Sequence, residues 1–338
     1  METLLLDAKK YENIEKAAVI LKNGGIVAFP TETVYGLGGN GLSKESAEKI
    51  YAAKGRPSDN PLILHLADPM QAENYCYTEP MYYTLAAAFM PGPLTVIMKK
   101  KDSVPYTTTG GLDTVAVRVP LDESARKLIS LCGFPVAAPS ANLSGSPSPT
   151  KAEHVIGDLS GRVDAILCGG ECEIGLESTI VKIEGEHLTL LRPGAITPDM
   201  LKEVFPNVVV DDCTTRKYGE NETPAAPGMK YRHYAPRAKV TVLGGSTDQI
   251  TEFQRKFLSD KSVGILCADT LSGDRVKSLG KDPRDMAKRL FSALREFEEM
   301  EEVTDIYAAM PPDTGIGSAV RNRLLKAAGF CVLNLKED

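Results

Sequence analysis

Short apolar runs alternate with amphipathic stretches along most of this chain of 338 residues, and no other feature limits its possible folds as strongly. The apolar runs predict buried strands over 26–29, 62–66, 94–98, 115–119 and 136–138. Helices are expected between them, one over 13–22 capped by Asn13, one beginning at Ser43, and one from Asp122 to Gly133. Two later strands, 179–183 and 188–191, form a predicted hairpin across Gly185. The pattern indicates a mixed α/β domain, with parallel and antiparallel pairs both open.

The sequence pattern changes over 206–238, where the hydrophobic periodicity fades and Pro, Gly, Asn and Thr accumulate. Such a stretch is longer than a loop that merely connects two elements, so we expect it to have a function of its own. Beyond it, strands are expected over 240–243, 263–267, 305–309 and 331–335, with helices over 247–258, 283–300 and 316–328 between them. We therefore expect a first domain over 1–206, a linker over 207–238 and a small α/β domain over 239–338.

Composition is that of an ordinary soluble globular protein, with 43% apolar and 25% charged residues. The formal net charge of -6 argues against a broad nucleic-acid surface, which needs a basic excess, but it allows a local basic pocket. Seven cysteines without a CxxC pair favour reduced thiols in the cytosol over a zinc site. Neither a signal peptide nor an apolar run near the ~20 residues of a membrane span is found, so a cytoplasmic protein is expected.

Neither of the common phosphate-binding loops is predicted. The motif GxxxxGK[ST] does not occur. A formal GxGxxG is made by Gly36, Gly38 and Gly41, but six residues separate it from the preceding strand, and the next helix begins only near Ser43. We therefore expect a mobile, glycine-rich loop there and not a dinucleotide site.

Polar residues nevertheless follow the ends of predicted strands and helices. Thr31-Glu32-Thr33 comes directly after the first buried strand, where its hydroxyls could bind a small polar substrate or simply form a turn. Lys54-Gly55-Arg56 follows a helix, where the two cations could hold a phosphate or merely interact with the helix dipole. Both interpretations stay open for each segment when it is taken alone.

His65 and Arg118 lie inside apolar strands. A single histidine in such a place is commonly a core residue, and an arginine is either buried beside an anion or directed outward. Ser178, Arg192 and the segment 139–145 add hydroxyl, amide and cationic groups at other strand ends. Each signal is weak, but their number favours one shared pocket in the first domain.

Taken together, these segments resemble the threonylcarbamoyl-AMP synthase family in its long, two-domain form with a YrdC-like catalytic domain. The matching stretches are PTETVYGLG (30–38), KGRPSDNPL (54–62), PGPLT (91–95), GLDTVAVRVP (111–120), PSANLSGSPSPT (139–150), GLESTIV (175–181) and LRPGAIT (191–197). The stretch PGMKYRHYAP (227–236) resembles the signature that joins the two domains of the long form. The resemblance covers nearly all of residues 1–238, and beyond them only the size and the α/β pattern match.

The resemblance implies an α/β fold, with a YrdC-like mixed, twisted open sheet and helices followed by a smaller Rossmann-like α/β domain. It implies a nucleotidyltransferase that converts L-threonine, bicarbonate or CO2, and ATP into threonylcarbamoyl-adenylate and pyrophosphate, the first step of tRNA threonylcarbamoyl-adenosine modification. Mg²⁺ is expected with the ATP, largely on phosphate oxygens, without a metal site of the protein's own. Partner transferase proteins would receive the product, a direct tRNA contact is left open, and no membrane contact is expected.

Site residues are carried over by motif position. The resemblance implies catalytic roles for Lys54 and Arg56. It implies an L-threonine pocket made of Thr33, His65, Arg118, Ala138 and Ser178. It implies an ATP side made of Lys54, Arg56, Asn60, Thr114, Ser140, Ser148 and Arg192. Tyr231 and His233 of the linker would then close over the nucleotide as part of a lid that excludes water.

Three other interpretations stay open. One is a module that binds double-stranded RNA or tRNA, which the acidic balance weakens. Another is a carbamoyltransferase of the hydrogenase-maturation type, which would bring zinc-finger cysteines that this chain lacks. The third concerns only the C-terminal domain, which could serve as a docking or dimerisation surface.

Overall fold

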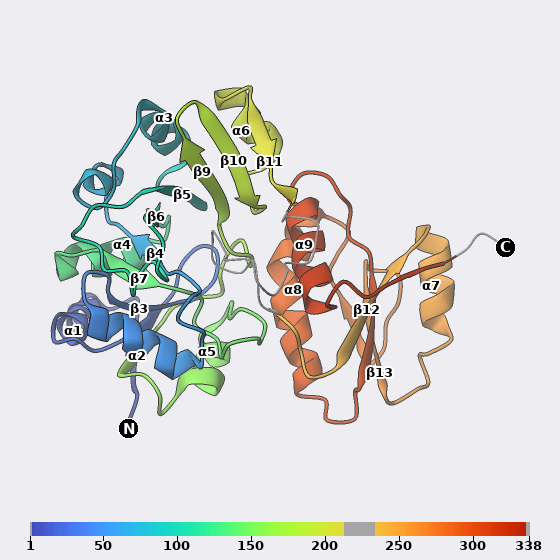
Figure 1. Ribbon diagram of the computed structural model, residues 1–338. Coiled ribbons are helices and arrows are strands. Elements are labelled where there is room, and N and C mark those ends of the chain that lie inside the picture. Colours follow the sequence, from blue (N-terminus) through green and yellow to red (C-terminus); the bar gives the residue numbers. More distant parts are fainter. Residues whose placement is uncertain (1, 213–233, 336–338) are drawn as a thin grey trace. The chain divides into compact units, whose positions relative to one another are not determined.

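The computed structural model describes residues 2–212 and 234–335, and these fall into two compact units (Figure 1). Of the described residues, the first unit holds 2–144, 148–173 and 177–212. The second unit holds 234–335 together with two short segments, 145–147 and 174–176. Each unit is built around one sheet of its own.

The first unit contains an eleven-stranded sheet in which parallel and antiparallel pairs are mixed, as the sequence predicts. In spatial order its strands are β1 (Leu4–Asp7), β8 (Ala165–Cys168), β2 (Val27–Phe29), β3 (Gly36–Asn40), β7 (Val136–Ala138), β4 (Ile63–His65), β6 (Thr114–Arg118), β5 (Leu94–Lys99), β9 (Thr179–Glu184), β10 (His187–Arg192) and β11 (Val208–Val210). The predicted hairpin is confirmed, because β9 and β10 pair antiparallel across Gly185, whose φ is 61°. The expectation that periodic structure ends at 206 is wrong, since β11 pairs in parallel with β10.

The helices of the first unit are α1 (Tyr11–Lys22), α2 (Lys44–Lys54), the 3-10 helix η1 (Pro69–Asn74), α3 (Pro80–Phe89), α4 (Glu123–Cys132), α5 (Ala152–Leu159) and α6 (Pro198–Val204). Two predicted caps are confirmed: the side chain of Ser43 accepts from a backbone N–H of α2, and that of Asp122 does the same for α4. The cap predicted at Asn13 is wrong. The helix begins earlier because a turn between Asp7 and Lys10 starts it, and the Asn13 amide bonds to the Asp7 carbonyl instead.

Helices cover the central strands on one face of this sheet and only some of the strands on the other face. On the first face, α2, α3 and α5 pack on the central strands, as Ile50, Tyr82 and Val155 share a core cluster with Leu64 and Val117. On the second face, α1 and α4 pack over strands β1, β8, β2 and β7 through a separate cluster. On the second face of the remaining strands, no helix contributes to the apolar cluster.

That remaining part of the second face carries a small cluster made only of strand residues, Ile63, Ile97, Ala116, Ile180 and Leu191. Cross-strand pairing aligns Ile63 with Ala116, and Ala116 with Ile97, so all three side chains point to the same side. The cluster therefore forms an apolar floor over β4, β6, β5, β9 and β10.

The glycine-rich segment after β2 is not the mobile loop that the sequence suggests. Residues 36–40 form β3, a mostly buried strand between β2 and β7. A Cβ on Gly38 would lie 2.7 Å from the Val136 side chain and 2.8 Å from the Phe29 ring. The glycines therefore let the Phe29 ring lie close against β3, and the formal GxGxxG reflects packing and not nucleotide binding.

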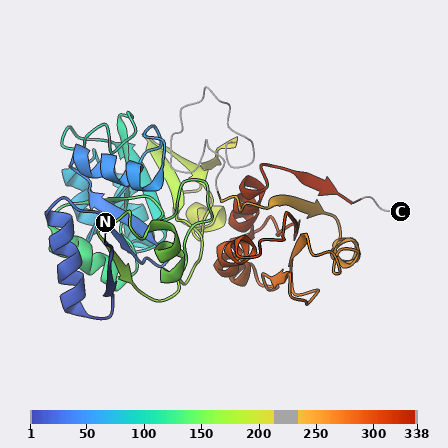
Figure 2. The same cartoon turned by 90° about the horizontal axis from the view of Figure 1, so that it is seen from below.

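The second unit is a five-stranded, fully parallel sheet in the order β14 (Val276–Ser278), β13 (Val263–Cys267), β15 (Asp305–Ala309), β12 (Lys239–Gly244) and β16 (Val332–Asn334). Its helices are α7 (Thr247–Arg255), α8 (Pro283–Glu298) and α9 (Gly317–Ala327). They lie on both sides of the strands, with α7 on one side and α8 and α9 on the other (Figures 1 and 2). This confirms the smaller Rossmann-like α/β domain that the sequence predicts.

Two further facts hold for residues 2–212 and 234–335. No helix in these ranges is long and apolar enough to cross a membrane. The six cysteines they contain are free thiols.

Candidate active site

A row of polar side chains crosses the second face of the first sheet, next to the apolar floor. His65 at the end of β4 pairs with Arg118 at the end of β6, and Arg118 pairs with Thr95 in β5. Paired residues direct their side chains to the same face, so these three lie side by side. Ala138 pairs with Ile63 of the floor and therefore borders the same space. The sheet thus brings three of the five predicted threonine-pocket residues together.

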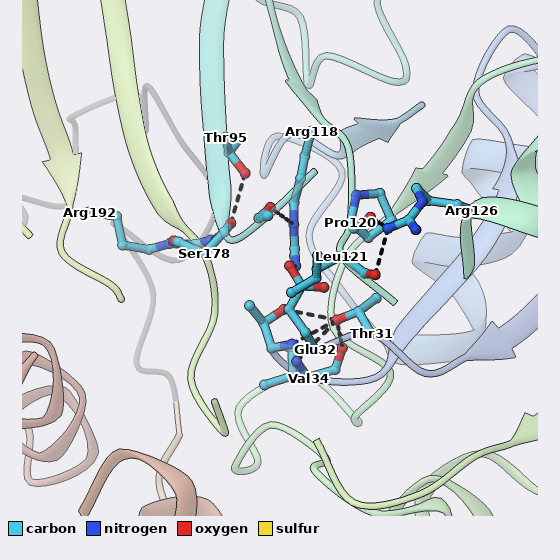
Figure 3. A network of polar contacts seen from close by, with 12 residues as sticks. Thr31, Glu32, Val34, Thr95, Arg118, Pro120, Leu121, Arg126, Ser178 and Arg192 are labelled. Carbon is cyan, nitrogen blue, oxygen red and sulfur yellow. Dashed lines mark hydrogen bonds and ion pairs between the residues drawn. The ribbon is translucent and has the colours of Figure 1, made fainter. Parts of the chain in front are cut away.

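Arg118 is buried, with 4% of its surface exposed, and its anionic partner is Glu32. Arg118 Nη2 lies 2.7 Å from Glu32 Oε1, and Nε donates to the Gly92 carbonyl at 3.4 Å. Figure 3 shows the guanidinium of Arg118 reaching Glu32 beside the turn that begins at Thr31. Of the two alternatives that the sequence leaves for this arginine, the buried one is confirmed.

His65 is buried beside this arginine and stays neutral. Burial, followed by the positive charge of Arg118, lowers the pKa of His65 from 6.5 to about 3. Its Nδ1 lies 3.1 Å from the Ile63 carbonyl, and its ring meets that of Phe29 edge to face at 6.1 Å. The neutral imidazole adds no charge of its own, so the charges at this end of the row are those of Arg118 and Glu32.

Each hydroxyl has one hydrogen, and this determines which of Thr31 and Thr33 donates to the other. Thr31 Oγ1 has one hydrogen, and it donates this to the Val34 carbonyl at 2.6 Å. The 2.9 Å contact between Thr31 Oγ1 and Thr33 Oγ1 therefore requires Thr33 to be the donor. With its hydrogen used in this way, the Thr33 hydroxyl can only accept a hydrogen bond from a ligand, such as one from an amine or a hydroxyl.

Ser178 joins β5 to β10 just before β9. Its Oγ lies 2.7 Å from Thr95 Oγ1, and Arg192 donates to both its carbonyl, at 3.0 Å, and its Oγ, at 3.1 Å. The three side chains are labelled in Figure 3: Thr95 lies in β5, Arg192 in β10, and Ser178 directly before β9, the strand between them. Arg192, which the resemblance assigns to ATP, thus touches the residue that it assigns to threonine, and the two halves of the predicted site are adjacent here.

Lys54 is the last residue of α2, and Gly55 caps that helix in a left-handed conformation with φ 60°. The lysine side chain is buried, and its ammonium donates to the Ser140 carbonyl at 2.5 Å and to the Asn142 carbonyl. The segment 139–145 is held against α2 in return, because the Ser144 N–H donates to the Lys54 carbonyl. The lysine is therefore part of a packed polar junction and not simply a surface cation at a helix end.

Arg56, Asn60 and Thr114 lie at the opposite ends of β4 and β6 from His65 and Arg118. Arg56 donates from Nη2 to the Pro61 carbonyl at 3.1 Å and from Nε to the Asn60 carbonyl at 3.4 Å. Asn60 is almost fully buried, and its Oδ1 makes no hydrogen bond within the described residues. Since Ile63 pairs with Ala116, Thr114 lies toward Pro61. These three residues share a region, but the structure does not bring Thr114 next to Arg118.

Ser140 and Ser148 lie in the long turn after β7. Ser140 Oγ donates to Asn142 Oδ1 at 2.5 Å, and Ser148 Oγ donates to Glu177 Oε1 at 2.5 Å. An isolated bridge joins Ser140 to Gly36 at the start of β3, so this turn lies beside the Thr31–Tyr35 loop. Tyr231 and His233, predicted to close over the nucleotide, lie outside the described residues.

Four residues of this network were not assigned a role from the sequence, namely Glu32, Thr95, Asn142 and Glu177. All four lie within the motif stretches, so their position in the motifs was the available signal. What the sequence did not provide was a partner for each of them.

Comparison with known proteins gives two family models that together span most of the chain. One, described as "Telomere recombination", matches residues 19–194, and the other, described as "Threonylcarbamoyl-AMP synthase, C-terminal domain", matches residues 196–329. The threonylcarbamoyl-AMP synthase of Bacillus subtilis is 46% identical over 95% of this chain and 94% of its own length. The chain belongs to the threonylcarbamoyl-AMP synthase family. The resemblance seen in the sequence is confirmed.

A relative from Pyrococcus abyssi extends this likeness to three dimensions. The Pyrococcus abyssi threonylcarbamoyl-AMP synthase is 44% identical over 95% of this chain and 96% of its own. A crystal structure of P. abyssi Sua5 complexed with L-threonine superposes with a TM-score of 0.93, at 41% identity, and covers 99% of this chain and 100% of that one. Both the fold class and the enzyme class, a nucleotidyltransferase, are confirmed.

Proposed function

We propose that the second face of the first sheet is the site where this chain makes threonylcarbamoyl-adenylate from L-threonine, bicarbonate or CO2, and ATP. The observation that carries this proposal is the row of His65, Arg118 and Thr95 beside an apolar floor. A cation set in an apolar, largely buried surface suits a small substrate that has a carboxylate at one end and a methyl group at the other.

The threonine end of the site is built around Arg118. Its guanidinium receives the substrate carboxylate, which suits the planar fork of an arginine better than a lysine. Thr33, whose hydroxyl can only accept, faces a donor of the substrate, either its amine or its β-hydroxyl. Ala138 and the floor accommodate the methyl group. Ser178 and the neutral His65 complete the pocket.

The ATP end is built around Lys54 and Arg56. These cations stabilise the charge that develops on the phosphoryl oxygens and on departing pyrophosphate. Ser140, whose carbonyl accepts from Lys54, and Ser148 both follow β7 and offer hydroxyl groups, while Arg192 lies at the boundary with the threonine pocket. Asn60 and Thr114 would contact the more distant part of the nucleotide, because they lie at the far end of β4 and β6.

The reaction needs positioning more than acid–base catalysis. The neutral amine of threonine forms a bond to the carbon of CO2 and loses a proton, or it bonds to the carbon of bicarbonate while a C–O bond breaks and water leaves; either route gives a carbamate. A carbamate oxygen then attacks the α-phosphorus of ATP, and the bond to the β-phosphate oxygen breaks to release pyrophosphate. Holding carbamate and phosphate in line supplies most of the rate.

Mg²⁺ is expected to enter with ATP, bound to the phosphate oxygens. The described residues offer no group of three or more His, Cys, Asp or Glu side chains that could hold a metal by themselves. This donor set suits a cation that is held mainly by the nucleotide, with the protein adding its own positive charges around it.

The product is a mixed anhydride that water can hydrolyse, so it must be protected and passed on. We expect the 207–238 linker, with Tyr231 and His233, to close over the site, and a partner transferase to carry the threonylcarbamoyl group to a tRNA adenosine. We also propose that the enzyme acts in the cytoplasm and that it can contact tRNA directly.

The test is to incubate the full chain with MgATP, bicarbonate and labelled L-threonine and to look for a threonine-containing adenylate. Omission of any one substrate should abolish the product, and pyrophosphate should appear in equal amount. ATP turnover that does not depend on threonine, or tRNA binding without any turnover, would contradict the proposal.

A further inference from the structure

We infer that Glu32 is a positioning residue for carboxylate recognition: it fixes Arg118 through one nitrogen and thereby presents the other to the substrate. This rests on the proposed threonine site. The inference concerns a residue that lies behind the pocket and acts through Arg118, and it begins with the rigidity of the two backbones that carry the pair.

Glu32 lies in a short turn that the Thr31 hydroxyl ties together through three hydrogen bonds to the backbone. Thr31 Oγ1 donates to the Val34 carbonyl at 2.6 Å and accepts from the backbone N–H groups of Thr33 and Val34 at 3.2 and 3.3 Å. Tyr35, which follows, is tied by its N–H to the Pro149 carbonyl. A carboxylate on such a turn has little freedom to follow a moving partner.

Arg118 is equally constrained at its backbone. The strand β6 lies inside the sheet, paired with β4 on one side and β5 on the other. Only the long side chain of Arg118 can therefore move, and its guanidinium is held by the 2.7 Å contact with Glu32 and the weaker 3.4 Å bond from Nε to the Gly92 carbonyl. Figure 3 shows this side chain fully extended between β6 and the Thr31–Val34 turn.

The pair is incomplete on both sides. Among the hydrogen bonds within the described residues, the guanidinium uses Nε for Gly92 and Nη2 for Glu32, and none involves Nη1. Glu32 Oε2 is buried and likewise has no partner within those residues. A buried ion pair that served stability alone would be expected to satisfy its polar atoms, because the desolvation of both ions otherwise exceeds their attraction. The unused Nη1 is what an anionic substrate group requires.

The sign of a charge change at Glu32 separates positioning from simple electrostatics. Removing the negative charge would make the surroundings of Arg118 more positive, so charge alone predicts tighter binding of a carboxylate. If Glu32 instead sets the position of the guanidinium, its loss weakens carboxylate binding despite that gain. The two accounts therefore predict changes in opposite directions.

The experiment compares L-threonine with L-threoninamide, which lacks the carboxylate charge, by calorimetric binding to the full chain. In the natural protein we expect threonine to bind about 10- to 100-fold more tightly, the usual range for a charge-assisted hydrogen bond. In Glu32→Gln and in Glu32→Asp, which keeps the charge but withdraws it by one methylene, the ratio should fall to within about threefold of one. ATP affinity should change by less than about twofold in each.

Glu123→Gln is the matched control, because it removes the same charge from an exposed position at the start of α4. It should leave the ratio unchanged. An unchanged or larger ratio in both Glu32 variants overturns the inference. Arg118→Lys tests the proposed site separately: if it leaves the ratio intact, the threonine site itself is wrongly placed.

A second readout does not depend on how well the variants fold. In a crystal structure of the natural chain with L-threonine, Arg118 should keep Nη2 on Glu32 and place Nη1 on the ligand carboxylate. A ligand-bound structure in which Arg118 has left Glu32 overturns the inference.

Discussion

Replacing Lys54 by methionine tests the polar junction beneath the proposed phosphate site. The substitution keeps an unbranched, apolar stem of similar length and removes the ammonium group. That group is buried and donates to the carbonyls of Ser140 and Asn142, which belong to the turn that follows β7. Methionine therefore leaves two carbonyl oxygens without their donor and loosens the turn.

The size of the effect follows from those two bonds. A hydrogen bond to a charged group contributes about 1.5–3 kcal/mol, and partial access of water to the freed carbonyls reduces the total, so we expect a loss of about 2–4 kcal/mol. Domains unfold with about 5–15 kcal/mol, so this is a large fraction. For a unit of this size the melting temperature should fall by about 5–12 °C.

Two assays separate stability from catalysis. Thermal unfolding followed by circular dichroism gives the stability loss, and threonine-dependent pyrophosphate release, measured well below the melting temperature, gives the rate. We expect the rate to fall by about 10²- to 10³-fold, as when a fixed donor to a developing charge is removed. Lys44→Met is the matched control, since Lys44 lies in the same helix, is exposed, and only pairs with Glu48 at 3.7 Å.

The reasoning is refuted if Lys54→Met unfolds at the same temperature as Lys44→Met, because the hydrogen bonds of Lys54 would then contribute nothing to the stability. A variant that loses stability but turns over within a few-fold of the natural protein would instead remove Lys54 from the reaction.

Three further predictions concern other parts of the first unit. Burial lowers the pKa of His65 from 6.5 to about 3. Between these pH values the imidazole is protonated in the unfolded chain but stays neutral in the folded chain. The contribution of His65 is therefore full above about pH 6.5 and declines as the pH falls toward 3, and His65→Gln should flatten the fall in melting temperature over that range; an equally steep fall contradicts it. Gly38→Ala should cost about 1–3 kcal/mol in urea unfolding, because the added Cβ would lie within 2.8 Å of two side chains, whereas Gly170→Ala, with open space around it, should cost less than about 1 kcal/mol. Ser178→Ala removes the hydroxyl that Arg192 contacts at 3.1 Å and should raise KM for threonine about tenfold or more, and equal KM values in steady-state kinetics would exclude Ser178 from the pocket.

The sequence by itself determined most of the local structure. Ser43 and Asp122 cap the helices that their positions predict, and Gly185 turns the hairpin that its neighbours predict. These features depend on hydrogen bonds and side-chain periods within a few residues, which a single sequence displays directly. The motif stretches also indicated the family and most of the residues of the proposed site.

Tertiary structure alone decided which polar groups meet. Glu32 and Arg118 are 86 positions apart, and Thr95 and Ser178 are 83 apart, so neither pair leaves a local pattern. Their contact depends on the order and register of the strands, which result from burying one face of the sheet and not from any one segment. The same cause turned the glycine-rich segment 36–40 into a strand, because the Phe29 ring needs a surface without side chains. Lys54-Gly55-Arg56 changed in the same way, from two cations at a helix end into one buried junction and one loop contact.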